Sequence, residues 1–140
     1  MNTGRFIGAA IGVWIVRVVL NGTFYNYVVG KRYAEIASSH PSMFRTVVPA
    51  YIAADLIFAL VFAFLFVKVG AALGAGVKAG VTLGVFVGIL SPVVGNVYRY
   101  YSVTFLPLGL VAVESVFQLI AHAIEGAIAG LIYKTRAENV

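Results

Sequence analysis

Four polar side chains recur along the last apolar stretch of the chain: Glu114, Gln118, His122 and Glu125. If this stretch is a helix, each residue turns it by about 100°, so the four lie at about 0°, 40°, 80° and 20° around its axis. They therefore share one face. Ionisable side chains at membrane depth are costly and normally face the interior of a bundle. We predict a buried polar face that binds an ion or carries a proton.

Two ionisable residues in earlier apolar stretches are the expected partners of this face. Arg17 lies about 18 Å along a helix that begins near residue 5, and Glu114 about 15 Å along a helix that begins near residue 104. Both depths are close to the middle of a hydrocarbon core about 30 Å thick. Arg17 with Glu114 is therefore the preferred buried ion pair, and Arg17 with Asp55 the second. Such a pair can also serve only to fix the register of the helices. The predicted binding cluster is Arg17, Asp55, Glu114, Gln118, His122 and Glu125.

A metal or haem site at His122 is a weaker alternative. Its expected co-ligands are Glu114 and Glu125, in a single His-x-x-Glu arrangement. Di-iron bundles instead use Glu-x-x-His from two helices. For haem, His122 needs a second His or a second copy of the chain, because His40 falls in a loop. Phosphate-loop, nucleophile-elbow, zinc-protease and kinase motifs are all missing from the sequence. We therefore predict no catalytic residue and no resident metal or cofactor.

The composition of the chain predicts an integral membrane protein. Of its 140 residues, 61% are hydrophobic and 11% are charged, whereas soluble domains are about 45–50% apolar and about 25% charged. The net charge is +5, but the basic residues are scattered and form no stripe with interleaved aromatics, which argues against nucleic acid as a partner. With no cysteine, the chain forms no disulfide and no thiolate site.

The apolar stretches divide the chain into four predicted spans within one domain, residues 1–140. Between them, residues 30–47 are polar and predict a loop that carries a short interfacial helix. Pro92 is expected to end or kink the third span, and residues 93–103 to form a turn or an interfacial segment. The prediction is an all-α membrane protein, an antiparallel bundle of four transmembrane helices at about 5–29, 49–69, 73–90 and 104–133.

Glycines spaced by four predict how these helices pack. Small residues at this spacing form a smooth ridge that lets another helix approach closely in lipid. The neighbour of the longest ridge is expected to be the first helix, the fourth helix or another molecule. The predicted packing glycines are Gly76, Gly80, Gly84 and Gly88 in the third span, Gly4, Gly8 and Gly12 in the first, and Gly126 and Gly130 in the fourth.

Four spans place both termini on one side of the membrane. Lys and Arg favour that side narrowly, five residues against four, which predicts cytoplasmic termini. Tyrosines collect on the other side, as an aromatic belt does at a membrane surface. Tyr98, Tyr100 and Tyr101 are alternatively a rim that binds a partner. The basic residues are Arg5, Lys68, Lys78, Lys134 and Arg136 on the terminal side, and Lys31, Arg32, Arg45 and Arg99 on the other.

Three functions follow from these patterns. The first is an oligomeric binding or transport module with an ionisable site near the midplane of the bilayer, since four helices are too few for a complete transport path. The second is a non-catalytic accessory or assembly subunit that docks onto other membrane proteins through its glycine ridges. The third is a membrane redox, metal or haem protein. The expected partners are the lipid bilayer and either copies of the chain or other membrane subunits.

Overall fold

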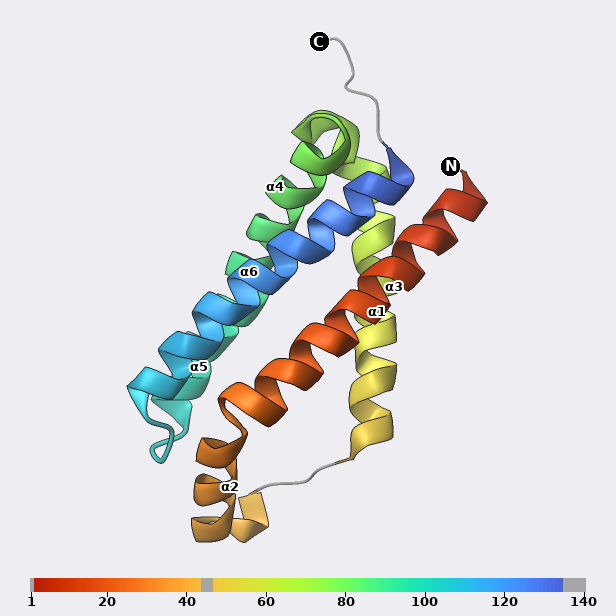
Figure 1. Ribbon diagram of the computed structural model, residues 1–140. Helices are drawn as coiled ribbons and strands as arrows, with labels where there is room; N and C mark the ends of the chain where they lie inside the picture. Colours follow the sequence, from red (N-terminus) through yellow and green to blue (C-terminus); the bar gives the residue numbers. More distant parts are fainter. Residues whose placement is uncertain (1, 44–46, 135–140) are drawn as a thin grey trace.

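The chain forms an all-α bundle of four long helices, which confirms the predicted fold (Figure 1). The computed structural model describes residues 2–43 and 47–134. Arg45, Arg136 and the polar tail beyond Lys134 lie outside these residues. The long helices are α1 (Thr3–Thr23), α3 (Val48–Leu73), α4 (Gly76–Gly88) and α6 (Leu108–Tyr133), and the shorter ones are α2 (Gly30–Ser39) and α5 (Val94–Ser102).

Four helical segments are long and apolar enough to cross a membrane: Thr3–Val28, Val48–Leu73, Gly76–Ser102 and Leu108–Tyr133. The chain therefore fits a multi-pass integral membrane protein. Two of these segments extend through a π-helical turn, η1 (Phe24–Val28) after α1 and η3 (Ile89–Val93) after α4. Only 17–39% of the most apolar window in each segment is buried inside the bundle. This pattern fits helices whose outer faces contact lipid.

Of the two forms predicted for residues 93–103, a turn or an interfacial segment, the turn is wrong, because the segment is helical. Pro92 lies inside the π-helix η3, and α5 continues the third span as far as Ser102. Proline lacks the backbone N–H that an α-helix needs and clashes with the preceding turn. A π-helical turn accommodates such an irregularity without ending the helix. The third span is therefore longer than its apolar run, and it carries polar residues of α5 to the far end of the bundle.

The start of the last helix also differs from the sequence estimate. The last helix begins at Leu108 and not near residue 104, because Pro107 is extended (φ −72°, ψ 138°) and stands just before the first turn. Within the predicted loop 30–47, the expected short helix is α2, whose ten residues are capped by His40. His40 precedes Pro41, and a residue before proline avoids the helical conformation. A 3₁₀ turn (Pro41–Met43) follows.

Helices α4 and α6 lie side by side and antiparallel, while α1 and α3 complete the bundle, and the start of α1 and the end of α6 lie at the same end (Figure 1). The α4–α6 contact is made by backbone. A Cβ atom on Gly80 would overlap the carbonyl oxygen of Gly126, and one on Gly130 would overlap that of Gly76. Of the three neighbours considered for the α4 ridge, α6 is the one in contact with it.

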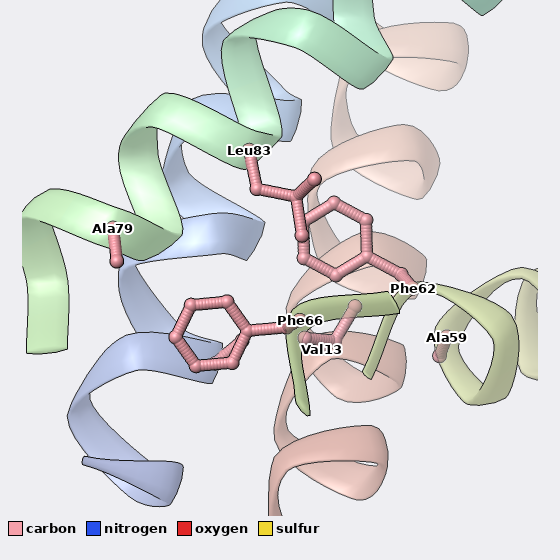
Figure 2. Packing of buried hydrophobic residues seen from close by; sticks show 7 residues of the cluster. Val13, Ala59, Phe62, Phe66, Ala79 and Leu83 are labelled. Carbon is pink, nitrogen blue, oxygen red and sulfur yellow. The ribbon is translucent and has the colours of Figure 1, made fainter. Parts of the chain in front are cut away.

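The apolar core joins α1, α3 and α4 against α6. Phe62 and Phe66 of α3 are fully buried and reach towards Leu83 of α4 and Val13 of α1 (Figure 2). Lipid is as apolar as these side chains, so the contact stabilises the bundle mainly through van der Waals packing. The indole Nε1 of Trp14 adds a polar link, because it donates to the carbonyl oxygen of Ile52 at 3.2 Å.

Candidate functional site

The polar face of α6 points into the bundle. Glu114 and Glu125 are 0% exposed, His122 is 1% and Gln118 is 8% exposed. Four small residues of the helix are buried as well, Ala121, Gly126, Ala129 and Gly130. Their small size lets neighbouring helices come close, and the long polar side chains fill the remaining space. The shared face expected from the spacing is therefore the buried face of α6.

An inner cluster forms around Arg17 of α1. Its Nε donates to Oδ1 of Asp55 on α3 at 2.7 Å, and its Nη1 donates to Oε1 and Oε2 of Glu125 on α6 at 3.1 and 3.4 Å. The guanidinium carbon also lies 3.9 Å from the centre of the Phe58 ring. One arginine thus ties three transmembrane helices together. The second-ranked pair, Arg17 with Asp55, is confirmed.

The preferred pair, Arg17 with Glu114, is wrong. Glu114 instead forms an ion pair with Arg99 of α5. The reason lies in the two helix boundaries described above. Because α6 begins at Leu108, Glu114 lies only about 9 Å along its helix, too close to one end to meet Arg17. And because α5 is helical, Arg99 reaches α6 from a segment that was expected to be a turn.

Tyr33 of α2 completes an outer cluster around Glu114. Its hydroxyl donates to Oε1 of Glu114, and Nη2 of Arg99 donates both to the Tyr33 oxygen at 3.0 Å and to Oε2 of Glu114. Burial, together with the hydrogen bond to the Glu114 carboxylate, raises the pKa of the Tyr33 hydroxyl above its usual value. The cluster therefore holds α2 and α5 against α6 at the end of the bundle far from the termini.

Neither Arg99 nor Tyr33 was predicted as a site residue. One signal for Arg99 is present in the sequence. Asn96 and Arg99 are three residues apart, so they share a helical face if the segment is helical. Both face α6, where Asn96 Nδ2 donates to Ser115 Oγ at 3.1 Å. A weaker signal marks Tyr33, because it shares the apolar side of α2 with Ile36, three residues later, and both pack against the cluster around Leu106 and Leu110.

Between the two clusters, Gln118 and His122 continue the polar face. Gln118 Nε2 lies 3.4 Å from both Asn21 Oδ1 and the Tyr25 hydroxyl. The Nδ1 nitrogen of His122 lies 2.7 Å from the carbonyl oxygen of Gln118, which can only accept, so Nδ1 carries the proton. The imidazole also meets the ring of Phe58 edge to face, with centres 5.1 Å apart. Polar groups therefore follow α6 from one cluster to the other.

The buried ion pairs contain more carboxylates than guanidiniums. Arg17 and Arg99 face Asp55, Glu114 and Glu125. The charges of Arg99 and Glu114 cancel each other. The excess negative charge therefore lies in the inner cluster, where Arg17 faces two carboxylates. A buried carboxylate that lacks its own counter-ion tends to be neutralised. This arrangement can hold one proton at Glu125, or a cation.

The metal alternative gains no geometric support. Among residues 2–43 and 47–134, no three His, Asp or Glu side chains are grouped so that they could hold a metal ion. Glu114 and Glu125 bond to arginines, and His122 bonds to the backbone of its own helix. The three residues proposed as co-ligands therefore belong to separate polar contacts.

The three rim tyrosines differ from one another. Tyr98 and Tyr101 are exposed, as expected of side chains at a membrane surface, whereas Tyr100 packs against the apolar cluster around Leu106 and Leu110. The Tyr100 ring also meets that of Tyr101 edge to face, with centres 5.2 Å apart, and a role of the three in binding a partner stays a prediction.

The glycines of the first span also differ. A Cβ on Gly12 would meet the side chains of Ile128 and Ile132, and one on Gly8 would meet Ile132 alone. Gly4 is exposed and lies beside Asn2 only. The α1 glycines therefore accommodate isoleucine side chains of α6, whereas the α4 glycines meet the backbone of α6.

Comparison with protein-family models, with curated proteins and with solved structures finds no match to this chain.

Proposed function

We propose that this chain is a small membrane protein that binds a proton at Glu125 and works as an oligomeric, proton-linked binding or transport module. The observation that supports this function is the inner cluster, in which one guanidinium faces two carboxylates. A charged side chain at membrane depth is expensive unless it is paired, and such residues commonly mark proton and ion pathways.

The geometry favours Glu125 over Asp55 as the carboxyl group that takes the proton. Arg17 approaches Asp55 at 2.7 Å but Glu125 only at 3.1 Å. The side chain of Glu125 is 1% exposed and that of Asp55 is 16% exposed. The less hydrated carboxylate with the longer contact costs more to keep ionised. A proton also fits the site better than a metal cation, because protonation needs one carboxyl oxygen, whereas a metal ion needs several ligands and no three His, Asp or Glu side chains of the described residues are grouped for it.

Each polar residue has a role in this proposal. Arg17 holds the carboxylates in place, and Glu125 exchanges the proton. His122 and Gln118 continue the route along α6 towards Glu114. The outer cluster of Glu114, Arg99 and Tyr33 then controls access from the end of the bundle far from the termini. Four helices leave little room for a complete path, so we place the route in an oligomer with both termini in the cytoplasm.

Proton movement into liposomes tests the proposal. Purified protein is reconstituted with a pH-sensitive dye inside the vesicles, and a membrane potential is imposed. We expect dye acidification with the unmodified chain and near-background rates with Glu125→Gln. Glu35→Gln is the matched control, since Glu35 is exposed on α2, and it should retain the full rate. Equal rates for the Glu125→Gln variant and the unmodified chain would disprove the proposed route.

A non-catalytic accessory subunit is the second candidate, and one observation favours it. Every buried carboxylate in the ion pairs of the described residues is bonded to an arginine of another helix. Closed pairs of this kind can act only to set helix register. The accessory function predicts a stoichiometric partner after purification in mild detergent, and assembly with that partner that survives Glu125→Gln.

A further inference from the structure

Each of the four long helices places one basic residue at the end of the bundle that carries the termini. They are Arg5 of α1, Lys68 of α3, Lys78 of α4 and Lys134 after α6, and all four are exposed. They take part in none of the ion pairs found among residues 2–43 and 47–134. Over the same residues, this end carries no exposed Asp or Glu.

The helix ends that carry these residues are fixed to one another. The Tyr133 hydroxyl of α6 accepts from the backbone N–H of Asn2, just before α1, at 3.4 Å. The Tyr133 ring packs edge to face on Phe66 of α3, with centres 6.3 Å apart. Backbone contact between Gly76 and Gly130 adds the start of α4. The basic side chains therefore project from a defined set of positions around one end of the bundle.

The opposite end has a different charge pattern. Its exposed basic residues, Lys31 and Arg32, lie near Glu35 on the same helix, α2. The guanidinium of Arg99 is engaged by Glu114 and Tyr33 inside the bundle. The uncompensated positive charge of the described residues is thus concentrated at the end with the termini. Lys and Arg at the boundary of a span are attracted to negatively charged lipid head groups within a Debye length of the surface.

We propose that the end formed by Arg5, Lys68, Lys78 and Lys134 binds the head groups of anionic phospholipids. Their phosphate groups match the charge of the four side chains, and the long stems of Lys and Arg reach the interface from helix ends. Lys68 supports this placement: its Nζ lies 5.6 Å from the ring centre of Phe64, an exposed side chain on the lipid-facing surface of α3. This binding surface does not depend on proton movement at Glu125.

Native mass spectrometry of the protein from mixed detergent and lipid tests this inference. The probes are phosphatidylglycerol, which is anionic, and phosphatidylcholine, which has no net charge. The test variant is Lys68→Gln with Lys78→Gln. The matched control is Lys31→Gln with Arg32→Gln, which removes the same charge from the other end. We expect the unmodified chain to retain phosphatidylglycerol in preference to phosphatidylcholine.

We expect the test variant to bind phosphatidylglycerol more weakly by roughly fivefold for each basic residue removed, and the control variant to bind it as the unmodified chain does. Equal loss in both variants would show that only net charge matters, and would overturn the proposal. Equal retention of the two lipids by the unmodified chain would overturn it as well. Because circular dichroism reports the helix content of each variant, misfolding is distinguished from lost binding.

Discussion

Gly84 of α4 is in backbone contact with His122 of α6: a Cβ atom on Gly84 would overlap the carbonyl oxygen of His122. The α4 glycines therefore pack against α6 immediately beside its polar face. They carry no acid or base, yet they fix the distance between α4 and the helix that presents Glu114, Gln118, His122 and Glu125. A change in that distance would shift all four side chains relative to Arg17 and Arg99.

A single methyl group at this contact should destabilise the fold. For Gly84→Ala we expect a loss of about 3 kcal/mol in the free energy of unfolding, at the upper end of overpacking effects, because the obstacle is backbone. Gly95→Ala is the control, since a Cβ there meets nothing within 4 Å, and it should be neutral or stabilising. Reversible unfolding in detergent measures both. A Gly84→Ala variant as stable as the unmodified chain would contradict this close contact between α4 and α6.

The outer ion pair should show strong coupling. Arg99→Met alone leaves the Glu114 carboxylate buried without its counter-ion, which costs about 3–5 kcal/mol. Adding Glu114→Gln removes that charge, so the double variant should recover most of the loss. The four unfolding free energies of this double-mutant cycle give the coupling directly. Additive single effects would mean that the pair contributes little to the stability of the bundle.

Arg17→Lys should not preserve the inner cluster. Arginine bonds Asp55 through Nε and Glu125 through Nη1, and a lysine has one nitrogen for both carboxylates. We expect a loss of about 1.5–3 kcal/mol, comparable to one hydrogen bond to a charged group. Arg5→Lys, at an exposed position, should leave the unfolding free energy unchanged. If Arg17→Lys behaves in the same way as this control, the two-carboxylate geometry is unimportant.

Tyr33 should make stability depend on alkaline pH. Its pKa is raised in the folded chain, so the folded state keeps the hydroxyl proton at pH values where the unfolded chain has lost it. This contribution is fully present below about pH 10, the usual tyrosine pKa, and declines as the pH rises towards the folded-state pKa. Tyr33→Phe should flatten the decline in unfolding free energy above about pH 10. Tyr101→Phe, at an exposed ring, should not.

The sequence predicts well those features that depend on spacing within one helix. The four polar residues of α6 share a buried face because their offsets nearly match the helical repeat. The glycines at intervals of four in α4 and α6 meet because small residues at this spacing leave a groove where another helix can approach. Both patterns are local, so neither depends on where the helix begins.

The ion pairs between helices were harder to predict, because each pair depends on where both of its helices begin and end. An error of four residues at the start of α6 moved the expected depth of Glu114 by about 6 Å, enough to assign it the wrong arginine. Placing residues 93–103 in a turn or an interfacial segment left Arg99 out of the predicted bundle. Whether a proline ends a helix or is absorbed by a π-turn depends on the packing of the neighbouring helices, which the local sequence does not encode.

The hydrogen bond from Trp14 to the carbonyl oxygen of Ile52 gives the chain an internal optical probe. Trp14 is its only tryptophan, and it lies one helical turn from Arg17 at the contact between α1 and α3. Its emission wavelength therefore reports the polarity at a single known position. Any rearrangement that separates α1 from α3, whether caused by a proton, a lipid or a partner, can be followed in the unlabelled protein.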